Sequence, residues 1–313
     1  MINENIKYAP IVLFVYNRAA HTEETVKALL KNKECTESEL FIYSDSAKNP
    51  DQHDAVENVR NYIRSINGFK KVTIREQEVN RGLSASIIYG VTEIVNKFDR
   101  VIVLEDDLIV SPYFLDFMNR SLEKYESDDR IACIHGYIYP VDTELPTVFF
   151  LKGADCWGWA TWKRAWTIFE PDGKKLQREL QERNLQSEFD FDGSYPYYKM
   201  MEDQSNGLNQ SWAVRWYASV FIKGMMTLYP GKSLVHNIGL DSSGTHCSDT
   251  DIYNTAVNMN RVAEVETSVE VSQHAREAFK RFFKGSQSKN PDLTIFQKLK
   301  NIIRPFYNLV VGK

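Results

Sequence analysis

The chain has 313 residues, of which 43% are hydrophobic and 26% charged, and this composition excludes general disorder and predicts a folded globular protein. Its net charge of -4 and pI of about 5.9 argue against a nucleic-acid-binding protein that works by bulk electrostatics. The N-terminal residues have no signal-peptide layout, and the four cysteines form no CxxC pair, so we expect a cytoplasmic protein with reduced thiols.

Strand-like and helix-like segments alternate from residue 11 to residue 104, which is typical of βαβ units around a parallel sheet. The predicted strands are 11–16, 40–43, 72–75 and 100–104. The predicted helices pass through 26–30, 56–63 and 87–95. Thr22 can cap the first helix, and Pro50 can open the second. The pattern predicts an α/β protein with a Rossmann-like, doubly wound and mostly parallel sheet.

The fourth predicted strand runs directly into three carboxylates, Glu105, Asp106 and Asp107. Ligands of open α/β sheets collect outside the carboxyl ends of the strands, where these acids would emerge. Three adjacent acids repel one another, and Mg²⁺ or Mn²⁺ prefers carboxylate and phosphate oxygens. The sequence therefore predicts a divalent cation shared with a diphosphate. The alternative is a strand that simply ends in solvent.

Polar groups also follow the three earlier strands: Asn17 and Arg18, then Asp45, then Asn80 and Gly82. An arginine can neutralise phosphate, an aspartate can accept hydrogen bonds from a ribose or base, and an Asn-x-Gly turn lets the backbone approach a ligand. Each residue also suits an ordinary turn. Their joint position at the carboxyl ends of the strands is what predicts a nucleotide site.

The second half of the chain is rich in aromatic residues and holds all six tryptophans. Ser111-Pro112 predicts a helix start, and short strands are expected near 131–134 and 148–151. Four tryptophans at helical spacings are expected to pack in the core: Trp162, Trp166, Trp212 and Trp216. Trp157 and Trp159 flank Gly158 and are better candidates for a sugar-binding surface.

The order strand, Asn-Arg, Ser-Asp, Asn-x-Gly and Glu-Asp-Asp-Leu resembles the nucleotide-sugar glycosyltransferases of the A-type fold. The EDDL tetrad, the Ser-Pro pair after it, and Gly158-Trp159 followed by a helix with Trp162 and Trp166 are similar to the N-acetylglucosaminyltransferase I family. The runs SWAVRWYAS and SGTHC resemble bacterial family-2-like glycan transferases of the cell envelope or capsule. The resemblance implies a metal-dependent inverting enzyme that moves a sugar, such as GlcNAc, from a UDP-sugar to a glycan or lipid-linked glycan.

The resemblance also implies roles for single residues. Arg18 and Asp45 would contact the nucleotide, and Glu105 would bond the donor sugar. Asp106 would bond the ribose or sugar, and Asp107 would bind Mn²⁺ or Mg²⁺.

Further residues carried over by the resemblance lie in the second half. Trp159 would form part of the sugar or acceptor wall, and His246 would add a metal ligand. The family's general base is an aspartate near the start of a helix, but this helix begins Asn209-Gln210-Ser211 and lacks that acid. Three acids are substitutes for the base: Glu202, Asp203 and Asp155.

Two alternatives to a transferase stay open at this point. Gln210, where an acid was expected, favours a protein that binds a nucleotide sugar or glycan without catalysis. A sugar-1-phosphate nucleotidyltransferase also uses an α/β sheet and Mg²⁺, but the first strand lacks the Gly-rich loop expected around a triphosphate.

The expected organisation is one catalytic domain, 1–284, with a nucleotide-binding half at 8–110 and an acceptor half at 111–250. The tail, 285–313, carries an apolar stripe interleaved with basic residues. Such a helix can lie on the inner face of the plasma membrane or pack on protein.

Overall fold

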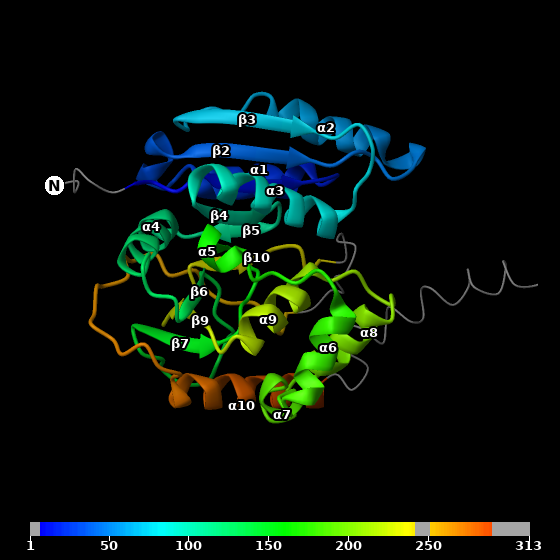
Figure 1. The fold of residues 1–313 in the computed structure, drawn as a ribbon. Coiled ribbons are helices and arrows are strands. Elements are labelled where there is room, and N and C mark those ends of the chain that lie inside the picture. Colours follow the sequence, from blue (N-terminus) through cyan, green and yellow to red (C-terminus); the bar gives the residue numbers. More distant parts are fainter. Residues whose placement is uncertain (1–6, 242–250, 290–313) are drawn as a thin grey trace, which may run out of the picture.

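The computed structural model describes residues 7–241 and 251–289, and an eight-stranded sheet runs through it (Figure 1). The strand order is β3-β2-β1-β4-β8-β6-β9-β7. The strands are β1 (Ile11–Val15), β2 (Glu39–Ser44), β3 (Lys71–Glu76), β4 (Arg100–Glu105), β6 (Ile131–His135), β7 (Val148–Lys152), β8 (Trp159–Trp162) and β9 (Met226–Pro230). The first four pair in parallel, as do β6 and β9, whereas β8 and β7 are antiparallel to their neighbours. The predicted α/β, mostly parallel sheet is confirmed.

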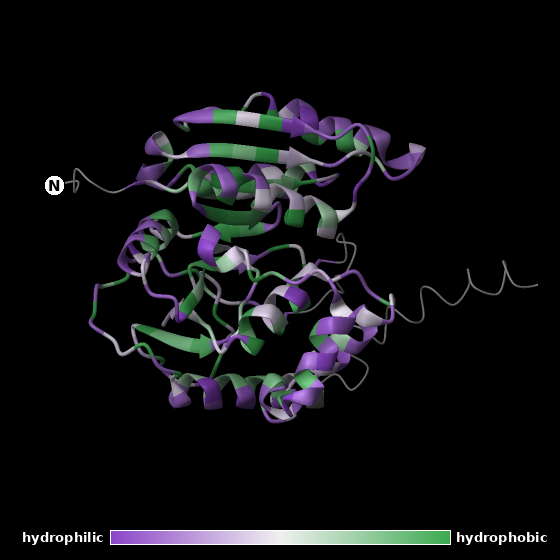
Figure 2. Cartoon of the chain, viewed as in Figure 1, coloured by the Kyte–Doolittle hydropathy of each residue, from purple (hydrophilic) through white to green (hydrophobic). Residues whose placement is uncertain are grey.

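Helices cover the sheet on its faces and ends. They are α1 (Ala19–Leu29), α2 (His53–Ile63), α3 (Leu83–Phe98), α4 (Phe114–Lys124), α5 (Lys163–Trp166), α6 (Gly173–Glu182), α7 (Gln186–Phe189), α8 (Tyr197–Ser205), α9 (Trp212–Ile222) and α10 (Gln273–Lys289). Helix α3 contacts β1 and β4, and α4 contacts β6 and β8. All five residues of β1 are buried, as expected for an apolar strand that is covered on both faces. Figure 2 shows the apolar strands inside and polar residues along the outer helices.

Two helix starts differ from the sequence prediction. Helix α1 begins at Ala19, ahead of Thr22, whose hydroxyl donates to the carbonyl oxygen of Arg18 at 2.9 Å instead of capping the helix. Pro50 opens a short 3₁₀ turn, η2 (Pro50–Gln52), and α2 begins after it. Both differences move only the start of a helix. The apolar positions that face the sheet are unchanged.

Residues 159–162 form β8, not the start of the predicted helix. Trp159 pairs with Val103 of β4 on one side and with His135 of β6 on the other. Every residue of β8 is buried. In the sheet its backbone groups form hydrogen bonds with β4 and β6, and its two tryptophan side chains are removed from water. The helical spacing of Trp162 and Trp166 was therefore misleading, because the helix α5 begins only at Lys163.

A tryptophan core, made of Trp159, Trp166, Trp212 and Trp216, joins β8 to α5 and α9. The ring centroids of Trp159 and Trp212 lie 5.5 Å apart, and those of Trp166 and Trp216 lie 5.0 Å apart. Trp162, Trp166, Trp212 and Trp216 are all 5% exposed or less. The prediction that these four pack in the core is confirmed.

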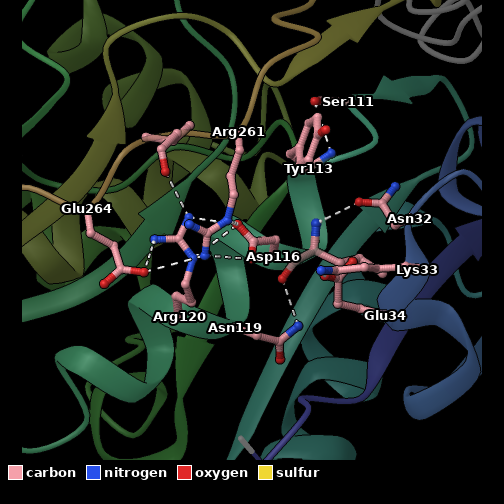
Figure 3. A network of polar contacts seen from close by, with 12 residues as sticks. Asn32, Lys33, Glu34, Ser111, Tyr113, Asp116, Asn119, Arg120, Arg261 and Glu264 are labelled. Atoms are coloured by element: carbon pink, nitrogen blue, oxygen red, sulfur yellow. Dashed lines mark hydrogen bonds and ion pairs between the residues drawn. The ribbon is translucent and has the colours of Figure 1, made fainter. Parts of the chain in front are cut away.

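An extended return segment, residues 251–272, leads back across α4 to α10 (Figure 1). Asp116 on α4 binds Arg120 at 2.7 Å and Arg261 of the return segment at 3.0 Å (Figure 3). Glu264 completes this network with a 3.2 Å ion pair to Arg120. The Ser111 hydroxyl also donates to the backbone oxygen of residue 258 at 2.6 Å. These contacts fix the return segment against α4 and the residues just before it.

Helix α10 lies at the opposite end of the molecule from β3 (Figure 1). It passes residue 285, where the tail was predicted to begin, and the predicted amphipathic stripe lies in 290–313, outside the described residues. None of the helices within 7–241 and 251–289 has the length and apolar character that a bilayer crossing requires.

Candidate active site

The three predicted acids lie at the carboxyl edge of the sheet and form an acidic cluster (Glu105, Asp106 and Asp107). Glu105 ends β4, and a turn at Asp106 and Asp107 leads into β5 (Leu108–Val110). Arg18 follows β1, the neighbour of β4, and its Nη2 donates to Asp106 and to Asp107 Oδ2, the latter at 2.8 Å. The sequence placed Arg18 near the acids because parallel strands end at one edge, and the structure joins them.

Burial dominates the electrostatics of this cluster. It raises the pKa of Glu105 to about 8, with the charges of Asp107 and Asp106 adding to the effect. It raises the pKa of Asp106 to about 6, against the attraction of Arg18. The Oδ2 atom of Asp106 is buried without a hydrogen-bond partner. The site therefore holds more negative charge than its single arginine balances, and a further cation would stabilise it.

These residues fit a divalent cation of the predicted kind. Among residues 7–241 and 251–289, no three His, Cys, Asp or Glu side chains are arranged as a metal-binding group. Mg²⁺ does not require one, because it is commonly bound through one or two carboxylates together with waters and substrate phosphates. Asp107 and the unpartnered oxygen of Asp106 are oxygen donors of this type. His246, the other predicted ligand, lies outside the described residues.

Asp45, at the end of β2, organises the loop between β3 and α3. Its Oδ1 accepts hydrogen bonds from the backbone N–H groups of Ser46 and Arg81, each at 2.9 Å. Its Oδ2 accepts one from the backbone N–H of Gly82 at 2.8 Å and one from the side-chain amide of Asn80 at 3.2 Å. Gly82 has a φ of 77°, which favours glycine. Four donors occupy the acceptor positions of this carboxylate. Its predicted contact with a nucleotide stays a prediction.

The strand β10 (Val235–Asn237) pairs with β5 and brings the segment that follows it against the acids. The N–H of Ile238 donates to the backbone oxygen of Asp107 at 2.9 Å. A Cβ atom on Gly239 would lie 2.1 Å from Asp107 Oδ2 and 2.8 Å from Arg18 Nη1. Gly239 therefore lets the backbone close over the ion pair. No local pattern marks it, because the contact depends on the pairing of β5 and β10.

Asn17 and Thr25 lie on either side of the start of α1. Asn17 is half-buried in the turn after β1, next to Arg18. Thr25 is buried, and its hydroxyl donates to the backbone oxygen of Asp106 at 2.9 Å while accepting the N–H of Leu108 at 3.1 Å. Thr25 thus fixes the turn that carries the two aspartates, a role that sequence reasoning did not find.

Asp155 lies in the segment that precedes β8, whose partner strand β4 ends at Glu105. Its Oδ1 accepts the N–H of Cys156 at 2.9 Å, and its Oδ2 lies 3.4 Å from the Tyr139 hydroxyl that donates to it. Burial raises the pKa of the Cys156 thiol well above its ordinary value, and the charges of Asp155, Glu105 and Asp107 add to this effect. One thiol therefore lies within the electrostatic reach of Asp155 and of the acidic cluster.

An aromatic cluster (Tyr137, Tyr139, Trp157 and Tyr253) lies beside Asp155, which it contacts through the Tyr139 hydroxyl. The rings of Tyr137 and Trp157 meet edge to face with centroids 4.7 Å apart, and Tyr137 also contacts Tyr139 at 5.3 Å. Asp155, Cys156 and Trp157 are all half-buried, between residues that are fully buried on both sides. A carboxylate among aromatic faces and hydroxyl groups has the chemistry of a sugar-binding surface.

The other two candidate bases have different surroundings. Asp203 on α8 accepts a 2.7 Å hydrogen bond from Lys199 of the same helix, and Glu202 lies 3.6 Å from the same ammonium. Glu202 also adds, after burial, to the raised pKa of Asp190. The charged neighbours of both acids are therefore Lys199 and Asp190, and not the acidic cluster.

Trp159 requires a correction. Its side chain is 1% exposed and belongs to the tryptophan core, so it does not form the predicted sugar or acceptor wall. The reason is that residue 159 is the first residue of the buried strand β8, which pairs with β4 on one side and with β6 on the other. Of the two tryptophans beside Gly158, Trp157 is the half-buried one.

A sheet of this topology with acids at its carboxyl edge defines the A-type fold of nucleotide-sugar-dependent glycosyltransferases. The family model for glycosyl transferase family 2 matches residues 11–180, more than half of the chain. The chain therefore belongs to glycosyl transferase family 2 and is a glycosyltransferase. No curated protein sequence matches it significantly.

Several solved structures share weak similarity with the chain. They include the mannosyltransferase PcManGT from Pyrobaculum calidifontis in complex with GDP-Man and Mn²⁺ (16% identity, TM-score 0.31, 43% of this chain and 37% of that one). Residues 1–349 of S. aureus TarS give 11% identity and a TM-score of 0.39 over 73% of this chain and 60% of that one. UDP-glucose pyrophosphorylase complexed with UDP-glucose gives 14% identity and a TM-score of 0.33 over 53% and 82%. This chain thus spans well under two thirds of the mannosyltransferase, and TM-scores this low add nothing to the family assignment.

Proposed function

We propose that the chain transfers a sugar from a nucleoside diphosphate sugar, of the UDP type, to a hydroxyl group of a glycan, with inversion at the anomeric carbon. The acidic cluster and Arg18 form the donor side, and the aromatic cluster forms the acceptor side. Residues 8–110 correspond to the donor half and 111–250 to the acceptor half. Membership of family 2 favours transfer over the two alternatives, sugar binding alone and nucleotidyl transfer.

We assign the general base to Asp155. The observation that carries this assignment is the antiparallel pairing of β8 with β4, in which Trp159 lies opposite Val103, so that the segment before β8, with Asp155, runs toward the edge where β4 ends at Glu105. An acid that removes the acceptor proton must lie close to the donor sugar, and the donor sugar must lie close to the acids that hold its diphosphate. Asp155 meets this condition, whereas Glu202 and Asp203 are paired with Lys199.

In the proposed reaction, Asp155 accepts the proton of the acceptor hydroxyl while the hydroxyl oxygen bonds to the anomeric carbon. The bond from that carbon to the diphosphate oxygen breaks, and the nucleoside diphosphate leaves with the electron pair. Arg18 donates hydrogen bonds to the diphosphate of the donor. Trp157 shields the sugar from water. Asp107 and Asp106 would hold a divalent cation, which would supply positive charge for the departing diphosphate.

The finer details rest on sequence resemblance. A UDP-linked donor such as UDP-GlcNAc and a role in cell-envelope polysaccharide synthesis follow from the similarity to the N-acetylglucosaminyltransferase I family and to bacterial glycan transferases. A lipid-linked acceptor and contact with the inner face of the plasma membrane depend on the basic tail, whose stripe lies outside the described residues.

The test uses the full chain with a panel of nucleoside diphosphate sugars, in Mn²⁺, Mg²⁺ or EDTA, and measures release of the nucleoside diphosphate with and without glycan acceptors. We expect turnover of at least one donor, and loss of that turnover by about 10²- to 10⁴-fold in Asp155→Asn. Asp128→Asn is the matched control, because Asp128 binds only exposed Arg130 through its side chain. Full activity of Asp155→Asn with strong loss in Asp203→Asn would move the base to α8.

A further inference from the structure

His135 is the last residue of β6 and is completely buried. Its Nε2 accepts the backbone N–H of Trp157 at 3.0 Å. Burial lowers the pKa of His135, and the charge of Asp155 and the backbone of Tyr137 act against this effect. A neutral imidazole that accepts at Nε2 carries its proton on Nδ1. The contact with Trp157 therefore selects the tautomer of His135.

The Nδ1 atom of His135 points toward the proposed base. It lies 3.9 Å from Asp155 Oδ2 and has no hydrogen-bond partner of its own. Among the described residues, His135 is the only basic side chain within ion-pair distance of Asp155. The ring is held by Tyr229, whose centroid lies 5.2 Å away in an edge-to-face contact.

The other groups that face Asp155 are neutral at physiological pH. Two cysteines and six tyrosines interact with its charge: Cys133, Cys156, Tyr137, Tyr139, Tyr195, Tyr197, Tyr217 and Tyr229. Burial raises the pKa of Tyr139 and of Tyr197 well above the ordinary value, so neither hydroxyl ionises near pH 7. These neighbours therefore act on Asp155 as hydrogen-bond donors and not as counter-charges.

We propose that His135 is a positioning residue that aims its Nδ1–H at Asp155, orients that carboxylate, and holds the Trp157 backbone with its other nitrogen. The inference rests on the proposed role of Asp155 as base. The acceptor proton ends on Asp155 and leaves to solvent, and His135 stays neutral throughout. Hydrogen bonds of catalytic groups are often long in the free enzyme and tighten with substrate, which suits the 3.9 Å separation.

Two amide variants separate the two nitrogens. In His135→Gln, the side-chain oxygen can accept the N–H of Trp157 but no donor faces Asp155. In His135→Asn, the amide nitrogen can reach the position of Nδ1 but the contact with Trp157 is lost. We expect His135→Gln to lower kcat/KM at pH 6 by about 10-fold more than at pH 8, because loss of a donor moves the acidic limb of the profile upward. His135→Asn should keep the wild-type position of that limb. Equal profiles in both variants would overturn the proposal.

A spectroscopic test does not depend on a known substrate. In the full-length protein labelled with ¹⁵N-histidine, His135→Gln identifies the signal of His135 among the six histidines. We expect an Nδ1–H tautomer that persists across about pH 6 to 8, and an Nδ1–H resonance that moves in Asp155→Asn. An Nε2–H tautomer, or a resonance that ignores Asp155→Asn, would overturn the proposal. Full activity of Asp155→Asn alone would instead refute the assigned base.

Discussion

Removal of Arg18 tests the charge balance of the donor side. Arg18 pairs with Asp106 and Asp107, and the three side chains are 16%, 7% and 11% exposed. Breaking a buried pair typically costs about 3–5 kcal/mol, because a charge is left uncompensated. Since all three groups keep some access to water, we expect Arg18→Ala to lower the free energy of unfolding by about 2–4 kcal/mol in EDTA. In a chain of this length that corresponds to a fall in Tm of about 3–6 °C.

The assay is urea unfolding of the full chain in EDTA and in saturating Mn²⁺, with the m-value checked for constancy. Mn²⁺ supplies positive charge near the same carboxylates, so it should stabilise Arg18→Ala more than the wild type. Arg75→Ala is the matched control, because Arg75 forms an exposed 3.3 Å pair with Glu93 that is worth at most about 1 kcal/mol. A loss in Arg18→Ala no larger than in Arg75→Ala, or an equal response to Mn²⁺, would refute the reasoning.

Two further predictions concern Gly239 and Asp190. Gly239→Ala places a Cβ atom 2.1 Å from Asp107 Oδ2. Calorimetry should therefore show that Mn²⁺-assisted binding of the donor is weakened by at least about 10-fold. Gly285→Ala should bind as the wild type does, because a Cβ atom on residue 285 would meet no other atom within 4 Å. Burial raises the pKa of Asp190 to about 6. Between about pH 4 and pH 6 the folded protein therefore keeps a proton on this carboxyl that the unfolded chain releases. The free energy of unfolding consequently falls as the pH rises through this range. Asp190→Asn, whose amide oxygen can still accept the N–H of Tyr198, should therefore gain about 1–2 kcal/mol over the wild type at pH 8 and little at pH 4. An unchanged difference between pH 4 and pH 8 in urea unfolding would contradict this.

The donor side could be predicted from sequence because it depends on local signals. Each apolar run ends in a polar residue, and parallel pairing brings those ends to one edge, which is how Arg18 and Asp106 come together. Asp45 and Gly82 were also placed at that edge, although the structure gives Asp45 a loop-organising contact that the sequence did not specify.

The contacts made by β6, β8 and β10 depend on pairings between distant segments, and there the sequence was less informative. The antiparallel insertion of β8 placed Trp159 in the core and not at a surface. Gly239 reaches Asp107 only through the pairing of β10 with β5. His135 had one weak signal, a histidine directly after the buried run at 131–134, and its contact with Trp157 follows from the pairing of β6 and β8.

The continuous sheet has a consequence for engineering. Backbone hydrogen bonds between β4 and β8 link residues 8–110 to the rest of the molecule, and the tryptophan core is anchored on β8. A chimera that exchanged the first 110 residues for another module would cut this strand pair and bare an apolar edge prone to aggregation. Single substitutions along the carboxyl edge leave this strand pair intact, whereas transplantation of a whole module does not.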